Sequence, residues 1–265
     1  MKNLSCLAVF LAMFAGCEKK PDTVYHGYGK LQIAFHHAAE GNPLQFDTMI
    51  YHSAAMYNYK VADLQYIISG VTLYRNGGEF VLPGTGGGIH YVDARIPSTR
   101  LWVTDQSIAP GTFDSLSFTF GLNAAENLSN RFPDPPLRDM AWPDILGGGY
   151  HYMKMNLVYG NSSGTVIEPF MFHLGIGQLY SSSLPNPDSI TGYVQNFFRV
   201  TLLKRFIIAG SRINTINCTM QVDHWFDGPE SFNFNDYPGG IMQSQPGMQK
   251  ACANGRKAFS GTISN

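Results

Sequence analysis

Residues 31–35 read Leu31-Gln32-Ile33-Ala34-Phe35, in which large apolar side chains recur at every second position. Near the other end of the chain, Thr215-Ile216-Asn217-Cys218-Thr219-Met220 alternates in the same way. Successive side chains of a β-strand point to opposite faces, so this period of two predicts strands with one buried face. Both ends of the chain are therefore expected to contribute strands to a β-rich domain.

Similar strand-like runs fill the sequence between these stretches, separated by glycine, proline or asparagine. Asn76-Gly77-Gly78 is typical of a hairpin turn. Helical periodicity is weak except at Gln249 to Asn254, where Gly255 follows as a terminator of a short helix. We predict an all-β fold, an antiparallel β-sandwich with a short C-terminal helical extension. The predicted strands span residues 30–35, 64–74, 88–92, 115–121, 150–158, 169–175, 196–208 and 213–222.

The N-terminal residues have the pattern of an export signal with a lipid attachment site. Lys2 precedes an apolar run over residues 7–14, and Ala15-Gly16-Cys17 follows it, the order typical of a lipoprotein signal. The run is too short to span a bilayer, which takes roughly 20 residues. We predict a signal peptide at 1–16, a lipidated tether at 17–29 and a domain at 30–265. The alternative is a simple signal peptide cleaved elsewhere, with Cys17 incidental.

A lipid on Cys17 predicts an anchor in a membrane of the cell envelope, on its periplasmic side or on the outer-membrane and surface side. The 18 Lys and Arg residues nearly balance the 19 Asp and Glu residues, so no nucleic-acid partner is expected. After the tether the chain has two cysteines, Cys218 and Cys252. In an oxidising compartment they could form one disulfide, and the alternative is two unpaired buried thiols.

Sequence signatures of common enzymes are missing. There is no Gly-x-Ser-x-Gly, no His-Glu-x-x-His, no Walker loop and no Rossmann glycine pattern. Gly84-Thr85-Gly86-Gly87-Gly88 precedes a predicted strand instead of opening a helix, which indicates a loop and not a phosphate-binding site. We therefore expect a binding protein and not an enzyme.

Histidines are the main candidates for a binding site. His90, His151 and His173 lie in predicted strands. Because residues two apart on a strand share a face, His151 is expected to point the same way as Met153 and Met155. Imidazole and thioether ligands together suit copper, especially Cu(I). The alternative is that the methionines fill the core and each histidine is simply hydrogen-bonded.

A series of short segments carries a resemblance to a known family. The segments are Ile33-Ala34-Phe35-His36-His37, Asn42-Pro43-Leu44, Val61-Ala62-Asp63-Leu64-Gln65-Tyr66-Ile67-Ile68-Ser69, Ile89-His90-Tyr91-Val92-Asp93, Ser117-Phe118-Thr119-Phe120-Gly121-Leu122-Asn123, Met140-Ala141-Trp142-Pro143, Gly147-Gly148-Gly149-Tyr150-His151-Tyr152-Met153-Lys154, Phe172-His173-Leu174-Gly175 and Val222-Asp223-His224-Trp225-Phe226. In order and spacing they resemble the MbnP-type copper-binding proteins, exported bacterial proteins that include lipoproteins. The resemblance covers nearly the whole chain after the tether.

This resemblance implies a β-sandwich that holds copper through histidines. His90 and His173 match the family's histidine positions best. His37 and His151 match histidines of recurring motifs. The expected ligands are therefore drawn from these four residues.

In some members of the family a tryptophan beside the ligands is oxidised to kynurenine by a partner di-haem protein. The matching position in this chain, two residues before His90, is Gly88, so that modification is not expected there. Trp142 lies in a family-like segment near the predicted strand that carries His151, and we expect it to be an ordinary buried indole.

We expect an exported lipoprotein that binds copper, as Cu(I), for copper acquisition, storage or delivery. The alternative is a metal-free surface β-sandwich that binds a glycan or a partner protein. Its 14 tyrosines and 18 phenylalanines could stack on sugars, although the core of a sandwich also uses aromatic side chains.

Overall fold

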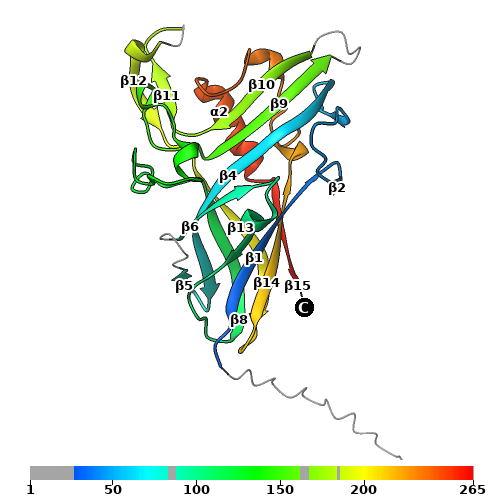
Figure 1. The fold of residues 1–265 in the computed structure, drawn as a ribbon, viewed down its shortest axis with the longest axis vertical. Helices are drawn as coiled ribbons and strands as arrows, with labels where there is room; N and C mark the ends of the chain where they lie inside the picture. The colour runs from blue at the N-terminus through cyan, green and yellow to red at the C-terminus, as the bar shows by residue number, and fades with distance from the viewer. Residues whose placement is uncertain (1–26, 83–87, 162–166, 184–185, 265) are drawn as a thin grey trace, which may run out of the picture.

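A computed structural model describes residues 27–82, 88–161, 167–183 and 186–264 (Figure 1). The predicted signal peptide at 1–16, the lipidation site Cys17 and the tether up to residue 26 lie outside the described residues. Within the described part of the chain, no helix has the length and apolar character needed to cross a membrane.

Fifteen strands and one α-helix make up the described part of the fold. The strands are β1 (Lys30–Ala39), β2 (Asn42–Pro43), β3 (Tyr51–His52), β4 (Tyr57–Arg75), β5 (Gly78–Val81), β6 (Ile89–Asp93), β7 (Leu101–Val103), β8 (Gly111–Phe120), β9 (Met153–Asn161), β10 (Ile167–Leu174), β11 (Gly177–Tyr180), β12 (Ile190–Val194), β13 (Phe198–Ile208), β14 (Ile213–Gln221) and β15 (Phe259–Ser264), and the helix is α2 (Gln245–Gly255).

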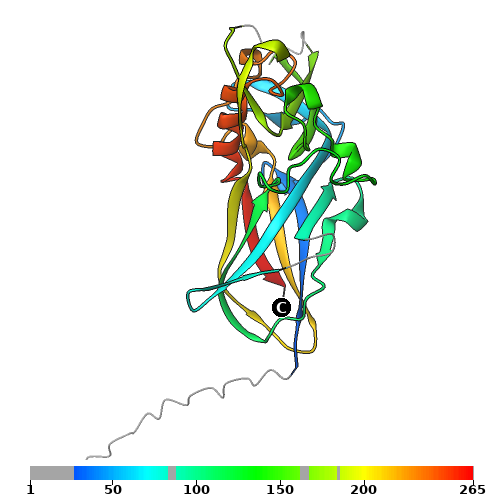
Figure 2. The same ribbon diagram turned by 90° about the vertical axis from the view of Figure 1, so that its left-hand side faces the viewer.

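The strands form two large sheets, which confirms the predicted all-β fold. One sheet has the order β15-β14-β1-β2, with β7 also paired to β1. The other has the order β10-β9-β4-β8-β13, with β3, β5 and β6 also paired to β4. Figure 2 shows β4 crossing the strands of the smaller sheet at an angle. A separate hairpin joins β11 to β12.

The 19-residue strand β4 organises the larger sheet (Figure 1). Its residues 57–66 pair with β9 and its residues 68–74 pair with β8. Residues 65–69 pair with β6 and residues 72–75 with β5. Since residues 72–74 pair with β5 and β8 at once, these two neighbours lie on opposite edges of β4. Residues 65 and 66 pair with both β6 and β9, so these two strands also lie on opposite edges of β4.

The hairpin between β4 and β5 confirms the turn predicted from sequence. Arg75 faces Gly78 across the ladder, and the two residues between them, Asn76 and Gly77, have φ values of 51° and 76°. Positive φ at both central residues is the geometry of a two-residue turn whose twist matches the flanking strands. Asparagine and glycine adopt it at little steric cost.

The smaller sheet contains a parallel pair that the sequence alone did not indicate. β1 pairs with β14 in parallel over nine positions, from Lys30 opposite Ile213 to Ala38 opposite Gln221. The alternating residues Leu31, Ile33 and Phe35 are almost fully buried, so they form the inner face of this sheet. The two stretches with the clearest period of two therefore lie side by side.

A single aromatic-rich core fills the space between the sheets. The Phe120 ring packs at 5.6 Å from Tyr66, 5.1 Å from Phe198, 5.3 Å from Trp225 and 5.5 Å from Phe259, measured between ring centroids. These partners come from both sheets and from the segment after β14. Burial of such rings is the main stabilising contribution to the fold.

The predicted C-terminal helix is present, and it begins earlier than expected. α2 lies at the same end of the molecule as β11 and β12, away from the start of β1 (Figures 1 and 2). The Ser244 side chain accepts a hydrogen bond from the Gly247 backbone N–H, which satisfies one of the free donors of the first turn. Pro246 is compatible with this first turn because no intrahelical partner is needed there.

The two cysteines do not form a disulfide in this structure. Cys218 lies on β14 and is completely buried, whereas Cys252 lies on α2, where its thiol donates to the Asn196 carbonyl at 3.1 Å. Burial raises the pKa of both thiols, that of Cys252 to about 12. The structure therefore has the arrangement considered as the alternative, two unpaired thiols.

Candidate metal centre

The four histidines expected as ligands occupy two separate places, on opposite faces of the larger sheet. His173 on β10 lies opposite Lys154 on β9, which lies opposite Gln65 on β4, which lies opposite Asp93 on β6. Side chains in such a row share one face. His90 is three residues before Asp93 on the same strand, so its side chain points to the other face.

His90 lies on the inner face, between the two sheets. Its ring stacks on Phe35 at 5.7 Å and on Trp102 at 5.5 Å. Its Nε2 lies 2.7 Å from the carbonyl oxygen of Thr99. Since a carbonyl can only accept, Nε2 carries the hydrogen and donates it. Burial lowers the pKa of His90, so the ring is neutral and enclosed by two aromatic rings.

His37 also lies on the inner face, but it does not pair with His90. Its Nε2 lies 3.0 Å from the hydroxyl of Tyr66. The ring of Phe35 contacts both Tyr66 and His90, so aromatic side chains separate the two histidines. Burial, together with the charge of Arg100, lowers the pKa of His37 to about 3. His37 and His90 thus occupy separate positions on the inner face and are not gathered around one point.

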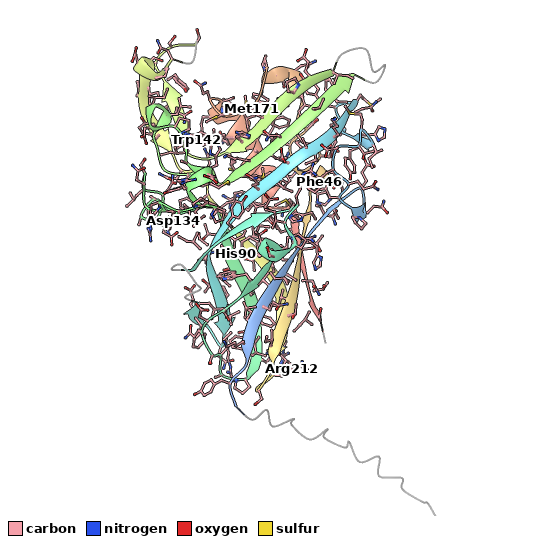
Figure 3. The ribbon with its side chains drawn as sticks, viewed as in Figure 1. Phe46, His90, Asp134, Trp142, Met171 and Arg212 are labelled. Carbon is pink, nitrogen blue, oxygen red and sulfur yellow. The ribbon has the colours of Figure 1, made fainter. Side chains whose placement is uncertain are left out.

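His151 and His173 come together on the outer face. His151 lies just before β9 and His173 near the end of β10. Their ring centroids are 5.2 Å apart, with the planes at 82°. They are 5% and 9% exposed. The indole of Trp142 packs edge-on to His151 at 4.6 Å, and Figure 3 shows Trp142 well separated from His90.

Backbone carbonyls fix the hydrogen position on His151. Its Nδ1 lies 3.1 Å from the carbonyl oxygens of both Met140 and Ala141. Two acceptors at one nitrogen require that nitrogen to be the donor, so the neutral ring holds its hydrogen on Nδ1. The lone pair is therefore on Nε2, which has no hydrogen-bond partner among the described residues.

A series of hydrogen-bonded side chains places the hydrogen of His173 on Nε2, whereas His151 carries its hydrogen on Nδ1. The Nδ2 of Asn156 lies 3.5 Å from the Asp63 carboxylate, and this contact turns the amide oxygen toward His173. That oxygen lies 3.0 Å from His173 Nε2, which donates to it. The Nδ1 of His173 is then left with a lone pair, and it is buried without a hydrogen-bond partner among the described residues. The carboxylate of Asp63 is held in turn by Arg95 at 3.5 Å.

Both rings of this pair are neutral over the physiological pH range. Burial is the main cause of a pKa of about 3 for His151, with further contributions from His173 and Lys154. Burial and the charge of Lys154 lower the pKa of His173 to about 4. A neutral imidazole with an unused lone pair is the form that binds a metal ion.

The described residues place no third His, Cys, Asp or Glu ligand beside this pair. The described residues contain no group of three or more His, Cys, Asp or Glu side chains placed to hold a metal ion. The expected sharing of a face by His151 with Met153 and Met155 is wrong. Met155 lies opposite Phe172, and both methionines are completely buried in the core, whereas His173 and its neighbours lie on the other face. The strand begins only at Met153, so its alternation does not extend back to His151.

Sequence reasoning named both histidines as candidates but did not indicate the residues that orient them. Asn156 and Asp63 carry no motif and lie 93 positions apart in sequence. Two strand registers bring them together, since Asn156 lies opposite Asp63 on β4 and opposite Met171 on β10. In the sequence, the only indication of where Asn156 points was the strand period of two, which places Asn156 on the same face as Lys154.

The fold and the site together define an all-β protein with a buried pair of neutral imidazoles. A model of the MbnP family matches residues 28–243, and the chain therefore belongs to the MbnP family. Among solved structures it is similar to MbnP from Methylosinus trichosporium, with a TM-score of 0.55 and 17% sequence identity over 89% of this chain and 99% of that chain. That similarity concerns the fold. Comparison with curated protein sequences finds no match.

Proposed function

We propose that this member of the MbnP family binds one Cu(I) ion between His151 Nε2 and His173 Nδ1. The observation that carries the proposal is the buried, unpartnered Nδ1 of His173 beside the neutral ring of His151. An unsatisfied buried polar atom costs roughly 1–3 kcal/mol, and a bound metal ion would remove this cost at His173 Nδ1. A metal ion accepts the lone pairs of both rings, which cannot hydrogen-bond to one another because neither free nitrogen carries a hydrogen.

The composition of the site favours Cu(I) over Zn(II). Zinc in proteins is almost always bound by four ligands, or by three with water in the fourth position. Two imidazoles with no further His, Cys, Asp or Glu nearby in the described residues suit an ion that accepts low coordination, as Cu(I) does. Asn156 and the two backbone carbonyls supply the outer hydrogen bonds that metal-binding histidines normally have. The site needs no modified tryptophan.

Copper acquisition, storage or delivery outside the cytoplasm is the role we propose for this site. The N-terminal sequence supports export and lipidation of Cys17, which anchors the protein to a membrane of the cell envelope. Mass spectrometry of the protein from membranes tests this part: we expect residues 1–16 to be absent and an acylated Cys17 at the new N-terminus. An unmodified thiol at residue 17 would contradict it.

Competition for Cu(I) against a coloured chelator tests the metal site itself. We expect the purified wild-type chain to take up one Cu(I). His151→Ala and His173→Ala should each weaken binding by more than about 100-fold, because loss of outer partners alone costs about 10- to 100-fold.

The matched control is His90→Ala, which removes a buried histidine of the inner face and should leave Cu(I) affinity unchanged. Near-ultraviolet circular dichroism establishes that each variant is folded. Absence of Cu(I) uptake by the wild-type chain would contradict the proposal and favour the metal-free alternative, a surface that binds a glycan or partner protein. Loss of binding in His90→Ala alone would also contradict it.

A further inference from the structure

Arg100 is a cation without a counter-ion. It is the last residue of the 3-10 helix η1 (Pro97–Arg100) and leads directly into β7. None of the ion pairs among the described residues includes Arg100, and its Nε is buried without a hydrogen-bond acceptor. A charged donor without an acceptor is stabilised by a partner. Arg100 as a whole is half-buried, so its guanidinium is open to a partner from outside the chain.

Arg95, five residues earlier, shows the contrasting case of a satisfied arginine. Its guanidinium contacts the carboxylates of Asp47 and Asp63. A third carboxylate of this region, that of Asp93, accepts a hydrogen bond from the backbone N–H of Arg95 at 2.8 Å. The acids of this region are thus engaged by other groups, and none of the described carboxylates lies within ion-pair distance of Arg100.

Arg100 lines a cavity of about 390 Å³. The lining combines Arg100, His36, His37 and several neutral polar side chains with the apolar side chains of Pro43, Leu44 and Phe46. A volume of this size is in the range of small-molecule sites, and here polar and apolar side chains share the lining. A bare inorganic ion would leave most of the cavity to water.

The charge of the lining selects the kind of ligand. The described lining residues include one arginine, no lysine and no carboxylate. His37 adds no charge at neutral pH, since its pKa is lowered to about 3. One guanidinium matches one negative charge, and its planar pair of N–H donors fits the two oxygens of a carboxylate.

We propose that this cavity binds a small organic monocarboxylate. The carboxylate pairs with Arg100, and the apolar part of the ligand lies against Pro43, Leu44 and Phe46. The site contains His37 of the inner face, so it is separate from the His151–His173 pair on the outer face. The inference does not depend on copper binding.

Isothermal titration calorimetry of the purified full chain tests the proposal, with sodium butyrate as the probe. We expect one saturable site with a Kd of about 10 mM or tighter. Acetate should bind more weakly, because it lacks the chain that contacts the apolar lining. Inorganic phosphate should also bind more weakly, because its second charge has no partner.

Arg100→Gln should weaken butyrate binding about tenfold or more, as expected for loss of a hydrogen bond to a charged group. The matched control is Arg212→Gln, since Arg212 lies far from the cavity residue Phe46 (Figure 3), and it should bind butyrate like the wild type. Urea unfolding without butyrate should show Arg100→Gln to be about as stable as the wild type, because Arg100 is half-buried and makes no ion pair among the described residues.

Three results would overturn the proposal. The first is absence of saturable butyrate binding, or equal binding by Arg100→Gln. The second is tighter binding of phosphate than of butyrate, which would contradict the match to a single charge. The third is a marked loss of stability in Arg100→Gln, which would mean that Arg100 already has a partner within the chain.

Discussion

At the scale of single residues, the hydrogen positions on the outer histidine pair follow from their neighbours. Two carbonyls make Nδ1 the donor on His151, and Asn156, oriented by Asp63, makes Nε2 the donor on His173. The free lone pairs therefore lie on different atoms of the two rings. An ordinary core histidine would have both nitrogens satisfied, and the unpartnered Nδ1 of His173 departs from that expectation.

Replacement of Asn156 tests whether this orientation matters for copper. Asn156→Ala removes the acceptor for His173 Nε2–H and should weaken Cu(I) binding by about 10- to 100-fold. Asn217→Ala is the matched control, because Asn217 makes the same type of contact with the exposed His36, at 3.0 Å. Chelator competition measures both. Equal affinities of Asn156→Ala and the wild type would show that the amide does not support the site.

The low pKa values of the outer pair predict an unusual pH dependence of copper binding. With pKa values of about 3 for His151 and about 4 for His173, protons compete with copper only in strongly acidic solution. Cu(I) affinity should stay nearly constant from pH 8 to pH 5 and fall below about pH 4. Titrations across this range measure it. A decline that begins near pH 6.5, the ordinary histidine value, would contradict the assignment.

At the scale of elements, the parallel pairing of β1 with β14 joins the two ends of the chain. Ile216 on β14 is completely buried opposite Ile33, whereas Ile213 at the start of the strand is 53% exposed. Ile216→Ala should lower the free energy of unfolding by about 2–5 kcal/mol. Ile213→Ala should change it by less than about 0.5 kcal/mol. Urea unfolding measures both, and similar effects of the two substitutions would contradict this burial.

The sequence was sufficient to predict strands, and insufficient to predict how they pair. Alternation at residues 31–35 and the turn at Asn76-Gly77 are local features, and both are present in the structure. The parallel pairing of β1 with β14 depends on side-chain packing between distant segments, which no local pattern records.

The same limit explains why the sequence did not predict which of the candidate histidines lie together. Alternation places residues relative to one another within a strand, but it does not say which face of a different strand they will join. The sequence therefore did not show that His90 and His173 lie on opposite faces of the larger sheet. The actual partner of His173 is His151, which precedes its strand and so escapes the alternation rule.

At the scale of the whole molecule, several buried neutral histidines link stability to pH. His37, His151 and His173 have pKa values of about 3, 3 and 4 when folded, against about 6.5 in an unfolded chain. Between these values the unfolded chain binds more protons, so the folded state loses stability as pH falls. The contribution of these neutral rings to the free energy of unfolding is fully present above pH 6.5 and diminishes toward pH 4.

Urea unfolding at pH 7.5, 6 and 5 measures this dependence. The slope should reach about 1.4 kcal/mol per pH unit for each such histidine. His37→Gln should reduce the slope by the share of one histidine. A free energy of unfolding that is flat between pH 7.5 and 5 would contradict the neutral, buried state of these rings.

The whole molecule thus has a sheet with different chemistry on its two faces, and the central claim is that the outer face binds copper. Long-range ¹⁵N nuclear magnetic resonance of the imidazole nitrogens, recorded before and after addition of one equivalent of Cu(I), tests this claim most directly. Cu(I) is diamagnetic, so each nitrogen remains observable. The account predicts large shifts at His151 Nε2 and His173 Nδ1 and none at His37 or His90. Shifts confined to His37 or His90, or no shift at any ring, would contradict it.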